Sequence, residues 1–203
     1  MRVPAAMALR ESEAAFNAWI KIGADGIVHV QVPRQEMGQG ITTALPMLVA
    51  EELDCELAQV RFEQAAVDAV YANATILGDA VPFRPDDRGW LADLARLTQY
   101  RFAELLGVQA TGGSTSVRDA WLLMRHAGAA ARGMLVAAAA KRWGVAPADC
   151  RTEAGAVRHA ASGRRLGYGA LAAEAAALPP PSRPKPKDPR QFRLLGKSPP
   201  RLD

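Results

Sequence analysis

Two short segments have the composition of loops that bind anionic ligands. They are Glu36-Met37-Gly38-Gln39-Gly40-Ile41-Thr42-Thr43 and Thr111-Gly112-Gly113-Ser114-Thr115-Ser116. Glycine lets a ligand come close to the main chain, and the free N–H groups at a helix start attract negative charge. Neither segment is a Gly-Lys-Ser/Thr phosphate loop or a GxGxxG dinucleotide motif. The first segment therefore predicts either a structural turn or a ligand loop, and the second predicts a cradle for phosphate or another polyoxygen ligand.

The second segment also has a purely structural interpretation. Ser116 with Asp119 fits a capping box, in which the hydroxyl accepts a backbone N–H of the first helical turn and the acid reaches back. This pattern explains Ser116 but gives no reason for the two glycines and two hydroxyl residues before it. Both interpretations stay open, and a ligand loop requires that the two segments converge on one charged ligand.

The cysteines and histidines do not form a metal-binding pattern. Cys55 and Cys150 lack CxxC spacing, and His29, His126 and His159 are scattered without an HxxxH or HExxH motif. This spacing excludes the common zinc patterns and an iron–sulfur cysteine set. We therefore assign no metal ligand.

The sequence also offers no obvious catalytic constellation. No Ser/His/Asp or Cys/His set can be assembled from isolated histidines. Glu36, Glu51 and Glu52 lie in or near the first segment. We interpret the pair Glu51 and Glu52 as lying in the first turns of a helix, where acidic side chains complement the helix dipole. No catalytic base is assigned.

Hydrophobic periodicity predicts an α+β fold, with a small antiparallel sheet packed by several helices, one of them long and Ala-rich. Residues 18–22 and 27–32 alternate around a Gly-Ala-Asp-Gly turn, which predicts a hairpin. The other expected elements are helices over 44–53, 90–106, 117–143 and 168–178, a strand over 60–64, and a hairpin over 151–166.

Some details of the helices also follow from the sequence. Thr42 or Thr43 can cap the helix over 44–53, and Pro46 is tolerable only in its first turn. The long helix should lie close against a neighbour because most residues of its expected buried stripe are small. That stripe comprises Trp121, Met124, Gly128, Ala131, Leu135, Ala138 and Ala139.

Composition indicates a globular protein of 203 residues, 49% hydrophobic and 23% charged, with a formal charge of +4. We expect a disordered lead-in over 1–15, one domain over 16–178 with an irregular insertion at 68–89, and a Pro-rich basic tail or linker over 179–203.

No aromatic ladder accompanies the tail's charge, so we expect no nucleic acid partner. No stretch approaches the roughly 18 apolar residues of a membrane span, so we expect no transmembrane segment. Periplasm and cytoplasm both remain open.

At the two loops the sequence resembles the molybdenum-binding subunit of the xanthine dehydrogenase/aldehyde oxidase family, and within it the isoquinoline 1-oxidoreductase beta-subunit branch. The most specific part is the pairing of Met-Gly-Gln-Gly with Thr-Gly-Gly-Ser-Thr-Ser. The similarity runs from about residue 16 to 203 and includes 17–22, 32–40, 48–53, 110–121, 125–143, 167–169 and 192–196.

The resemblance implies a molybdopterin site. The first loop would lie against the pterin and dithiolene end of the cofactor, and the second would line the pterin and its phosphate. Bacterial members of this kind use molybdopterin cytosine dinucleotide. The implied cofactor-binding residues are Met37, Gly38, Gln39, Gly40, Thr111, Gly112, Gly113, Ser114, Thr115 and Ser116.

The resemblance further implies a bacterial hydroxylase that oxidises an N-heteroaromatic or aldehyde substrate with water as the oxygen source. Electrons would leave through a separate 2Fe-2S subunit. Family subunits are several times longer and carry a late glutamate base, a role that nothing in this chain fills. We therefore expect the N-terminal part of a larger subunit, inactive without the missing C-terminal domains and prone to self-association through uncovered apolar surface. The alternative is a non-catalytic α+β interaction module that contacts a partner subunit.

Overall fold

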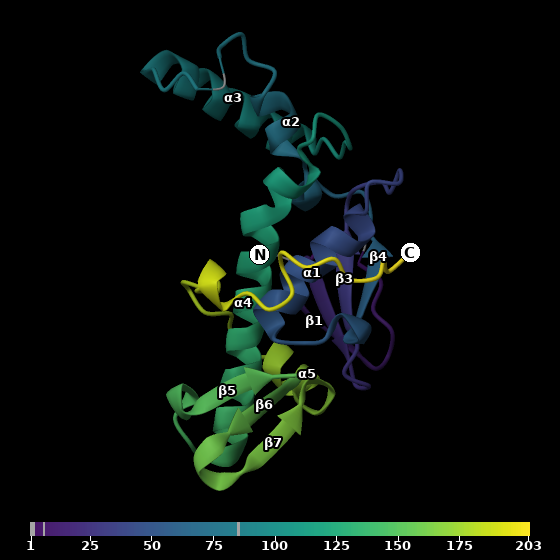
Figure 1. Cartoon of the computed structure of the whole chain (residues 1–203), viewed down its shortest axis with the longest axis vertical. Coiled ribbons are helices and arrows are strands. Elements are labelled where there is room, and N and C mark those ends of the chain that lie inside the picture. The colour runs from purple at the N-terminus through teal and green to yellow at the C-terminus, as the bar shows by residue number, and fades with distance from the viewer. Residues whose placement is uncertain (1–2, 6, 85) are drawn as a thin grey trace.

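The computed structural model describes residues 3–5, 7–84 and 86–203 and confirms the α+β class. A four-stranded sheet forms the middle of an elongated molecule, a smaller sheet lies at one end, and a helical arm projects from the other (Figure 1). One long helix runs beside the central sheet toward the small sheet and so connects the two.

The central sheet contains β1 (Glu13–Asn17), β2 (Ile20–Gly23), β3 (Val28–Val32) and β4 (Val60–Gln64), in that spatial order. The predicted hairpin is confirmed, because β2 pairs antiparallel with β3. The prediction of an antiparallel sheet is wrong at the last pair, since β3 and β4 run parallel. A parallel pair needs a crossover connection, and the helix between these strands supplies it.

The first strand begins earlier than the sequence suggested. β1 starts at Glu13, inside the expected lead-in over 1–15, and pairs antiparallel with β2. Met7 is also buried, and the carbonyl of Ala8 accepts a hydrogen bond from the Lys21 ammonium at 2.9 Å. This part of the lead-in is therefore packed on the sheet.

Helices α1 (Ile41–Leu53) and α4 (Ser116–Trp143) pack closely against each other. A Cβ added to Gly128 of α4 would lie 2.7 Å from the Cβ of Glu52 on α1. The expected stripe of small residues is confirmed as buried, although Trp121 at its start is only half-buried. Pro46 stands inside α1, beyond the first turn in which we expected it.

The projecting arm consists of α2 (Ala74–Gly78) and α3 (Trp90–Leu106) (Figure 1). The structure confirms the predicted bounds of α3, which ends at Gly107 with a φ of 63°. The region over 68–89, expected to be irregular, contains α2 and a 3-10 turn at Ala69–Tyr71.

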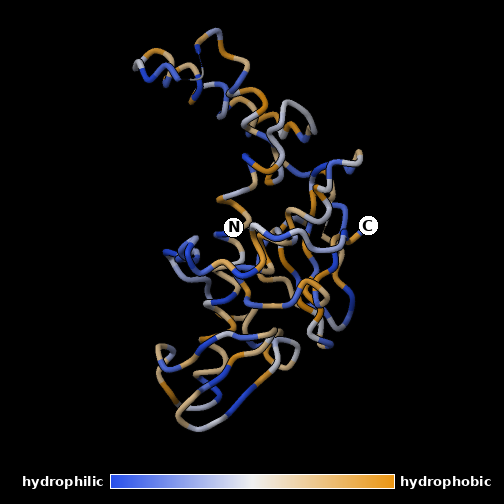
Figure 2. Tube along the Cα trace, viewed as in Figure 1, coloured by the Kyte–Doolittle hydropathy of each residue, from blue (hydrophilic) through white to orange (hydrophobic). Residues whose placement is uncertain are grey.

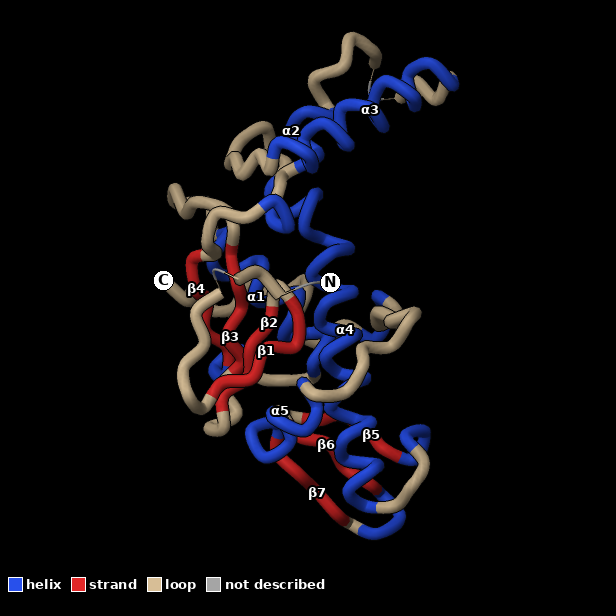
Figure 3. The backbone as a smooth tube through the Cα atoms, turned by 180° about the vertical axis from the view of Figure 1, so that it is seen from behind, coloured by secondary structure: helices blue, strands red, loops and turns tan. Residues whose placement is uncertain are grey.

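The small sheet contains β5 (Cys150–Glu153), β6 (Ala156–His159) and β7 (Arg164–Gly167), all antiparallel. The expected hairpin is present, but its second run is divided by a 3-10 turn into β6 and β7. Helix α5 (Tyr168–Ala176) follows and packs against α4. Figure 3 shows this sheet apart from β1–β4.

The tail over 179–203 is largely exposed but contacts α1 and α4. Its hydrophilic middle part (Figure 2) lies along α4 and α1 and carries a 3-10 turn at Pro189–Gln191. Glu51 and Glu52 bind it from the last turn of α1, so our assignment of this acidic pair to the first turns of a helix was wrong. In the described part of the chain, no helix is both long and apolar enough to cross a membrane.

Candidate functional site

The first candidate loop is organised by the carboxylate of Glu36. This group accepts the backbone N–H of Gly38 at 2.8 Å, Gly40 at 2.9 Å and Thr42 at 3.1 Å, and the Thr42 hydroxyl at 2.8 Å. The hydrogen bond from Gly40 leads the interactions that lower the pKa of Glu36 to about 2. Gly40 is the N-cap residue of α1, with a φ of 82° that favours glycine. Glu36 therefore caps the helix, and the predicted cap by a threonine hydroxyl was wrong.

This cap changes what the loop can offer a ligand. Several amides expected to face an external anion already bind Glu36. The side chain of Gln39 is also used within the loop, since its Oε1 accepts Met37 N–H at 2.6 Å and its Nε2 donates to the Gln35 carbonyl at 2.8 Å. The loop is thus a turn closed by its own hydrogen bonds, with few free main-chain donors for a ligand.

The second loop is fixed by hydrogen bonds of the buried Thr115 side chain. The Thr115 side chain is buried, donates to the Gly112 carbonyl at 2.8 Å and accepts from Asn73 Nδ2 at 2.7 Å. The predicted capping box is wrong, because α4 has Thr115 rather than Ser116 as its N-cap and the Thr115 side chain makes no hydrogen bond to the N–H groups of the first helical turn. Asp119 instead accepts the backbone N–H and the hydroxyl of Thr75.

Residues that follow the two parallel strands bring the loops together. Arg34, after β3, is buried and donates to Asp119 at 2.8 Å and to the Tyr71 carbonyl at 2.9 Å. Asn73, beyond β4, also donates to the Ala110 carbonyl at 2.9 Å. Ligand sites often lie outside the carboxyl ends of parallel strands, and both loops are fixed at this edge.

The two loops line one cavity of about 360 Å³. A direct hydrogen bond joins them, because Gln35 N–H donates to the Thr111 hydroxyl at 2.9 Å. Gly38, Gly40, Gly113 and Thr115 do not line it. The six expected residues that do are Met37, Gln39, Thr111, Gly112, Ser114 and Ser116, joined by Ile41, Ala44 and Val117.

The walls of the cavity are neutral and combine polar with apolar side chains. All nine lining residues are uncharged, with apolar walls from Ile41, Ala44 and Val117. Adding a Cβ to Gly112 brings only the Ile76 side chain within 4 Å, at 3.8 Å, so this wall leaves room for a ligand. The size and donor set fit the ring portion of a pterin cofactor, whereas neutralisation of phosphate charge is not supplied by these nine residues.

The C-terminal residues lie at the rim of the first loop. Arg201 donates to the Gly38 carbonyl at 3.1 Å and forms an ion pair with Glu36 at 3.3 Å. Leu202 N–H donates to the Thr43 hydroxyl at 2.9 Å. Sequence reasoning missed this contact because nothing local in the tail indicates where it docks.

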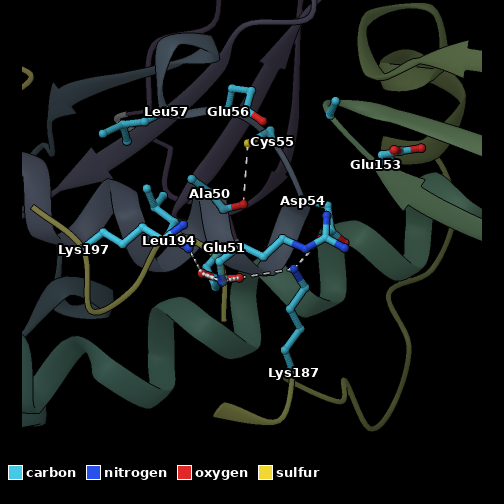
Figure 4. Close-up of a pocket in the computed structure, with 12 residues that line it drawn as sticks. Ala50, Glu51, Asp54, Cys55, Glu56, Leu57, Glu153, Lys187, Leu194 and Lys197 are labelled. Carbon is cyan, nitrogen blue, oxygen red and sulfur yellow. Dashed lines mark hydrogen bonds and ion pairs between the residues drawn. The ribbon is translucent and has the colours of Figure 1, made fainter. Parts of the chain in front are cut away.

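A second cavity, of about 340 Å³, lies between α1, the tail and the turn after β5 (Figure 4). Three of its charged side chains bind one another, since the Lys187 ammonium lies 2.5 Å from Asp54 and 3.4 Å from Glu51. Burial raises the pKa of the nearby Cys55 thiol to about 12, which keeps it from acting as a nucleophile. We interpret this cavity as part of the tail's anchorage.

A third cluster spans the central sheet with one residue from each strand. The Lys21 ammonium lies 2.9 Å from Glu13 and 2.8 Å from Glu63, while His29 lies 3.6 Å and 3.0 Å from the same two carboxylates. The geometry of Glu13, His29 and Glu63 could suit a metal ion. Because Lys21 already bridges both acids, we interpret the cluster as an internal ion-pair network. Only the strand register brings these four residues together, so spacing could not reveal it.

Comparison with known proteins gives the same class of cofactor as the resemblance. Residues 3–76 match the sequence model of the molybdopterin cofactor-binding domain family. This part of the chain is therefore similar to that family. The matched residues contain β1–β4, the whole first loop and α1.

Two curated relatives support the resemblance to the xanthine dehydrogenase/aldehyde oxidase family, which is confirmed. Isoquinoline 1-oxidoreductase subunit beta of Brevundimonas diminuta is 37% identical over 158 residues, which cover 77% of this chain and 16% of that protein. A membrane-bound aldehyde dehydrogenase of Gluconacetobacter polyoxogenes, named for pyrroloquinoline quinone, is 28% identical over 77% of this chain and 15% of its own length. The chain thus spans about a sixth of the length of these relatives.

Proposed function

We propose that the cavity between the two loops holds the pterin portion of a molybdopterin cofactor. The observation that carries this proposal is that loops far apart in sequence meet at one uncharged cavity, linked by a hydrogen bond between Gln35 and Thr111, which are 76 residues apart. The candidate contacts are the six lining residues of the expected set. Gly38, Gly40, Gly113 and Thr115 would shape the loops instead.

Each wall has a distinct part in this proposal. The main chain at Gly112 lets a flat ring approach, and Ser114 and Ser116 offer hydroxyl groups to its polar edge. Ile41 and Val117 exclude water from the ring faces. Glu36 holds the first loop in place from behind and does not touch the cavity.

For the larger protein, the proposal extends to molybdopterin cytosine dinucleotide and to hydroxylation of an N-heteroaromatic or aldehyde substrate with oxygen from water. When bound, the cofactor supplies the two-electron redox chemistry and the metal centre, and a separate 2Fe-2S subunit would carry electrons away. This chain would contribute binding and orientation only, and its catalytic base would come from another part of the enzyme.

A cofactor-binding measurement tests the proposal without any activity assay. The 203-residue chain is incubated with molybdopterin, separated from free cofactor, and analysed for pterin fluorescence after oxidation. Gly112→Val should fill the slot and reduce retained pterin at least tenfold, without backbone strain, because Gly112 has no positive φ. Gly167→Val is the matched control, since it lies on β7 in open space and also has an unstrained φ.

The alternative, a non-catalytic interaction module, predicts no specific pterin retention by the unaltered chain. Equal retention by both valine variants would also contradict the proposal. Because one relative is named for pyrroloquinoline quinone, that quinone is the second ligand to test. If the chain retained that quinone and not molybdopterin, the quinone would be the ligand of the cavity.

A further inference from the structure

Helix α3 packs on the rest of the molecule through a narrow face. Ala92 and Ala103 are its buried residues. Tyr100 lies on the same side, where a Cβ added to Gly78 of α2 would come within 2.0 Å of the tyrosine ring. This small-residue face is the one that α2 covers.

The opposite face of α3 is apolar and exposed. Trp90, Leu94, Leu97 and Leu105 share one side at about 100° per residue, together with the exposed Arg101. Leu91 and Phe102 lie beside them. Trp90 is 77% exposed and Leu105 is 81% exposed, and the other four are each just over half exposed. A surface helix normally turns its apolar stripe inward, so an outward stripe of this size marks an interaction site.

We propose that this stripe binds the same stripe of a second copy of the chain, with the two α3 helices antiparallel. The helical arm stands clear of the body (Figure 1), so a second arm can reach it without meeting the sheets. An antiparallel pair places the positive end of each helix dipole beside the negative end of the other. The twofold axis then passes near Leu97, and Trp90 of each copy meets Leu105 of the other.

The area and charges support a self-contact. Each copy contributes six large apolar side chains, and each side chain would lose roughly 100 Å² of exposed area. Both copies together would bury about 1,200 Å², which is in the lower range of specific interfaces. In the same alignment Asp93 of one copy comes beside Arg101 of the other. These two charged side chains are exposed. Asp93 makes an i,i+3 ion pair with Arg96 and Arg101 makes one with Glu104, and such exposed pairs cost little to rearrange.

The oligomeric state of the 203-residue chain tests the proposal directly. Sedimentation velocity should give the mass of two chains, and Leu97→Glu should reduce it to the mass of one. Val67→Glu is the matched control, because Val67 is a 90% exposed apolar residue outside α3. The Val67→Glu variant should stay dimeric. Circular dichroism checks that both variants keep their helices, as expected at exposed positions.

Cysteine cross-linking tests the orientation. Leu97→Cys should form a disulfide with its own copy, whereas Trp90→Cys should do so only when mixed with Leu105→Cys. Background should be low because Cys55 and Cys150 are buried and unpaired. A chain that stays monomeric at all concentrations, or a Leu97→Glu variant that remains dimeric, would overturn the proposal. Self-linking of Trp90→Cys would overturn the antiparallel arrangement.

Discussion

Oε2 of Glu51 accepts the backbone N–H of Leu194 at 2.7 Å, which joins the last turn of α1 to the tail. The same carboxylate also accepts the N–H groups of Arg193 and Leu195. Burial alone would raise the pKa of Glu51, but these N–H groups and the Lys187 ammonium lower it overall. One ionised side chain thus fixes three successive residues of the tail.

Removing the charge of Glu51 should release the tail. Glu51→Gln loses the charge-assisted bonds, and we expect tail opening to become easier by about 3 kcal/mol. Trypsin should then cleave after Arg190 and Arg193 far faster than in the unaltered chain. Glu174→Gln is the control, because Glu174 is an exposed residue that pairs with Arg142 on α4. Equal cleavage rates in the Glu51 variant and the control would contradict the anchor.

The first loop should loosen in acid. Because the pKa of Glu36 falls from 4.5 to about 2 in the folded chain, its cap stabilises the loop fully above pH 4.5. That stabilisation is lost as the pH falls from 4.5 to about 2. Hydrogen exchange of the Gly40 and Thr42 amides should therefore accelerate across this range, after correction for intrinsic rates. In Glu36→Gln the fast exchange should already be present at neutral pH.

Gly128 should be the least replaceable glycine of α4. Gly128→Val places its Cβ 2.7 Å from the Cβ of Glu52, so α1 and α4 must separate. We expect a loss of about 3 kcal/mol in the free energy of unfolding. Gly133→Ala, on the same helix, approaches only Pro181 of the tail, at 3.2 Å, and gains helix propensity. Urea denaturation should show almost no change in the free energy of unfolding of Gly133→Ala. Comparable losses in both variants would refute close packing at Gly128.

Lys21 should be required for the charge balance of the central sheet. Lys21→Met leaves the buried Glu13 and the partly exposed Glu63 without their shared cation, and we expect a loss of about 3 kcal/mol or more at pH 7. Burial raises the pKa of both acids, but hydrogen bonds and nearby cations lower it overall. This network therefore stabilises the chain above about pH 4.5 and less in acid, so the variant's deficit should shrink as the pH falls.

Thermal unfolding from pH 3 to pH 7 measures that deficit. Arg61→Met in β4 is the control, because Arg61 is exposed and its guanidinium donates hydrogen bonds to the carbonyls of Ala58 and Val60. A deficit that is constant with pH would argue against an electrostatic origin.

The sequence was sufficient where local signals dominate. The apolar period and Gly107 predicted α3, and the Gly-Ala-Asp-Gly turn predicted the β2–β3 hairpin. Composition alone also selected the two loops that meet at one cavity. Each of these signals lies within a few residues of the element that it specifies.

Non-local contacts explain the errors. The parallel β3–β4 pair depends on where α1 packs, and the burial of Glu51 depends on a tail more than a hundred residues away. The capping-box prediction was wrong because the Asp119 carboxylate accepts hydrogen bonds from Arg34 and Thr75 instead. No spacing rule connects these residues in the sequence. The roles of Glu36 and Asn73 were missed for a similar reason, since their importance lies in the bonds that they accept or donate.

Helix α4 separates two regions of the molecule by its length. Its 28 residues correspond to about 42 Å, from Ser116 at the cavity to Trp143 beside the small sheet. A fluorophore or affinity tag attached at Arg158, an exposed position on β6, would therefore sit too far away to disturb ligand entry. The remote sheet thus offers a handle for immobilising the protein while its loops remain accessible.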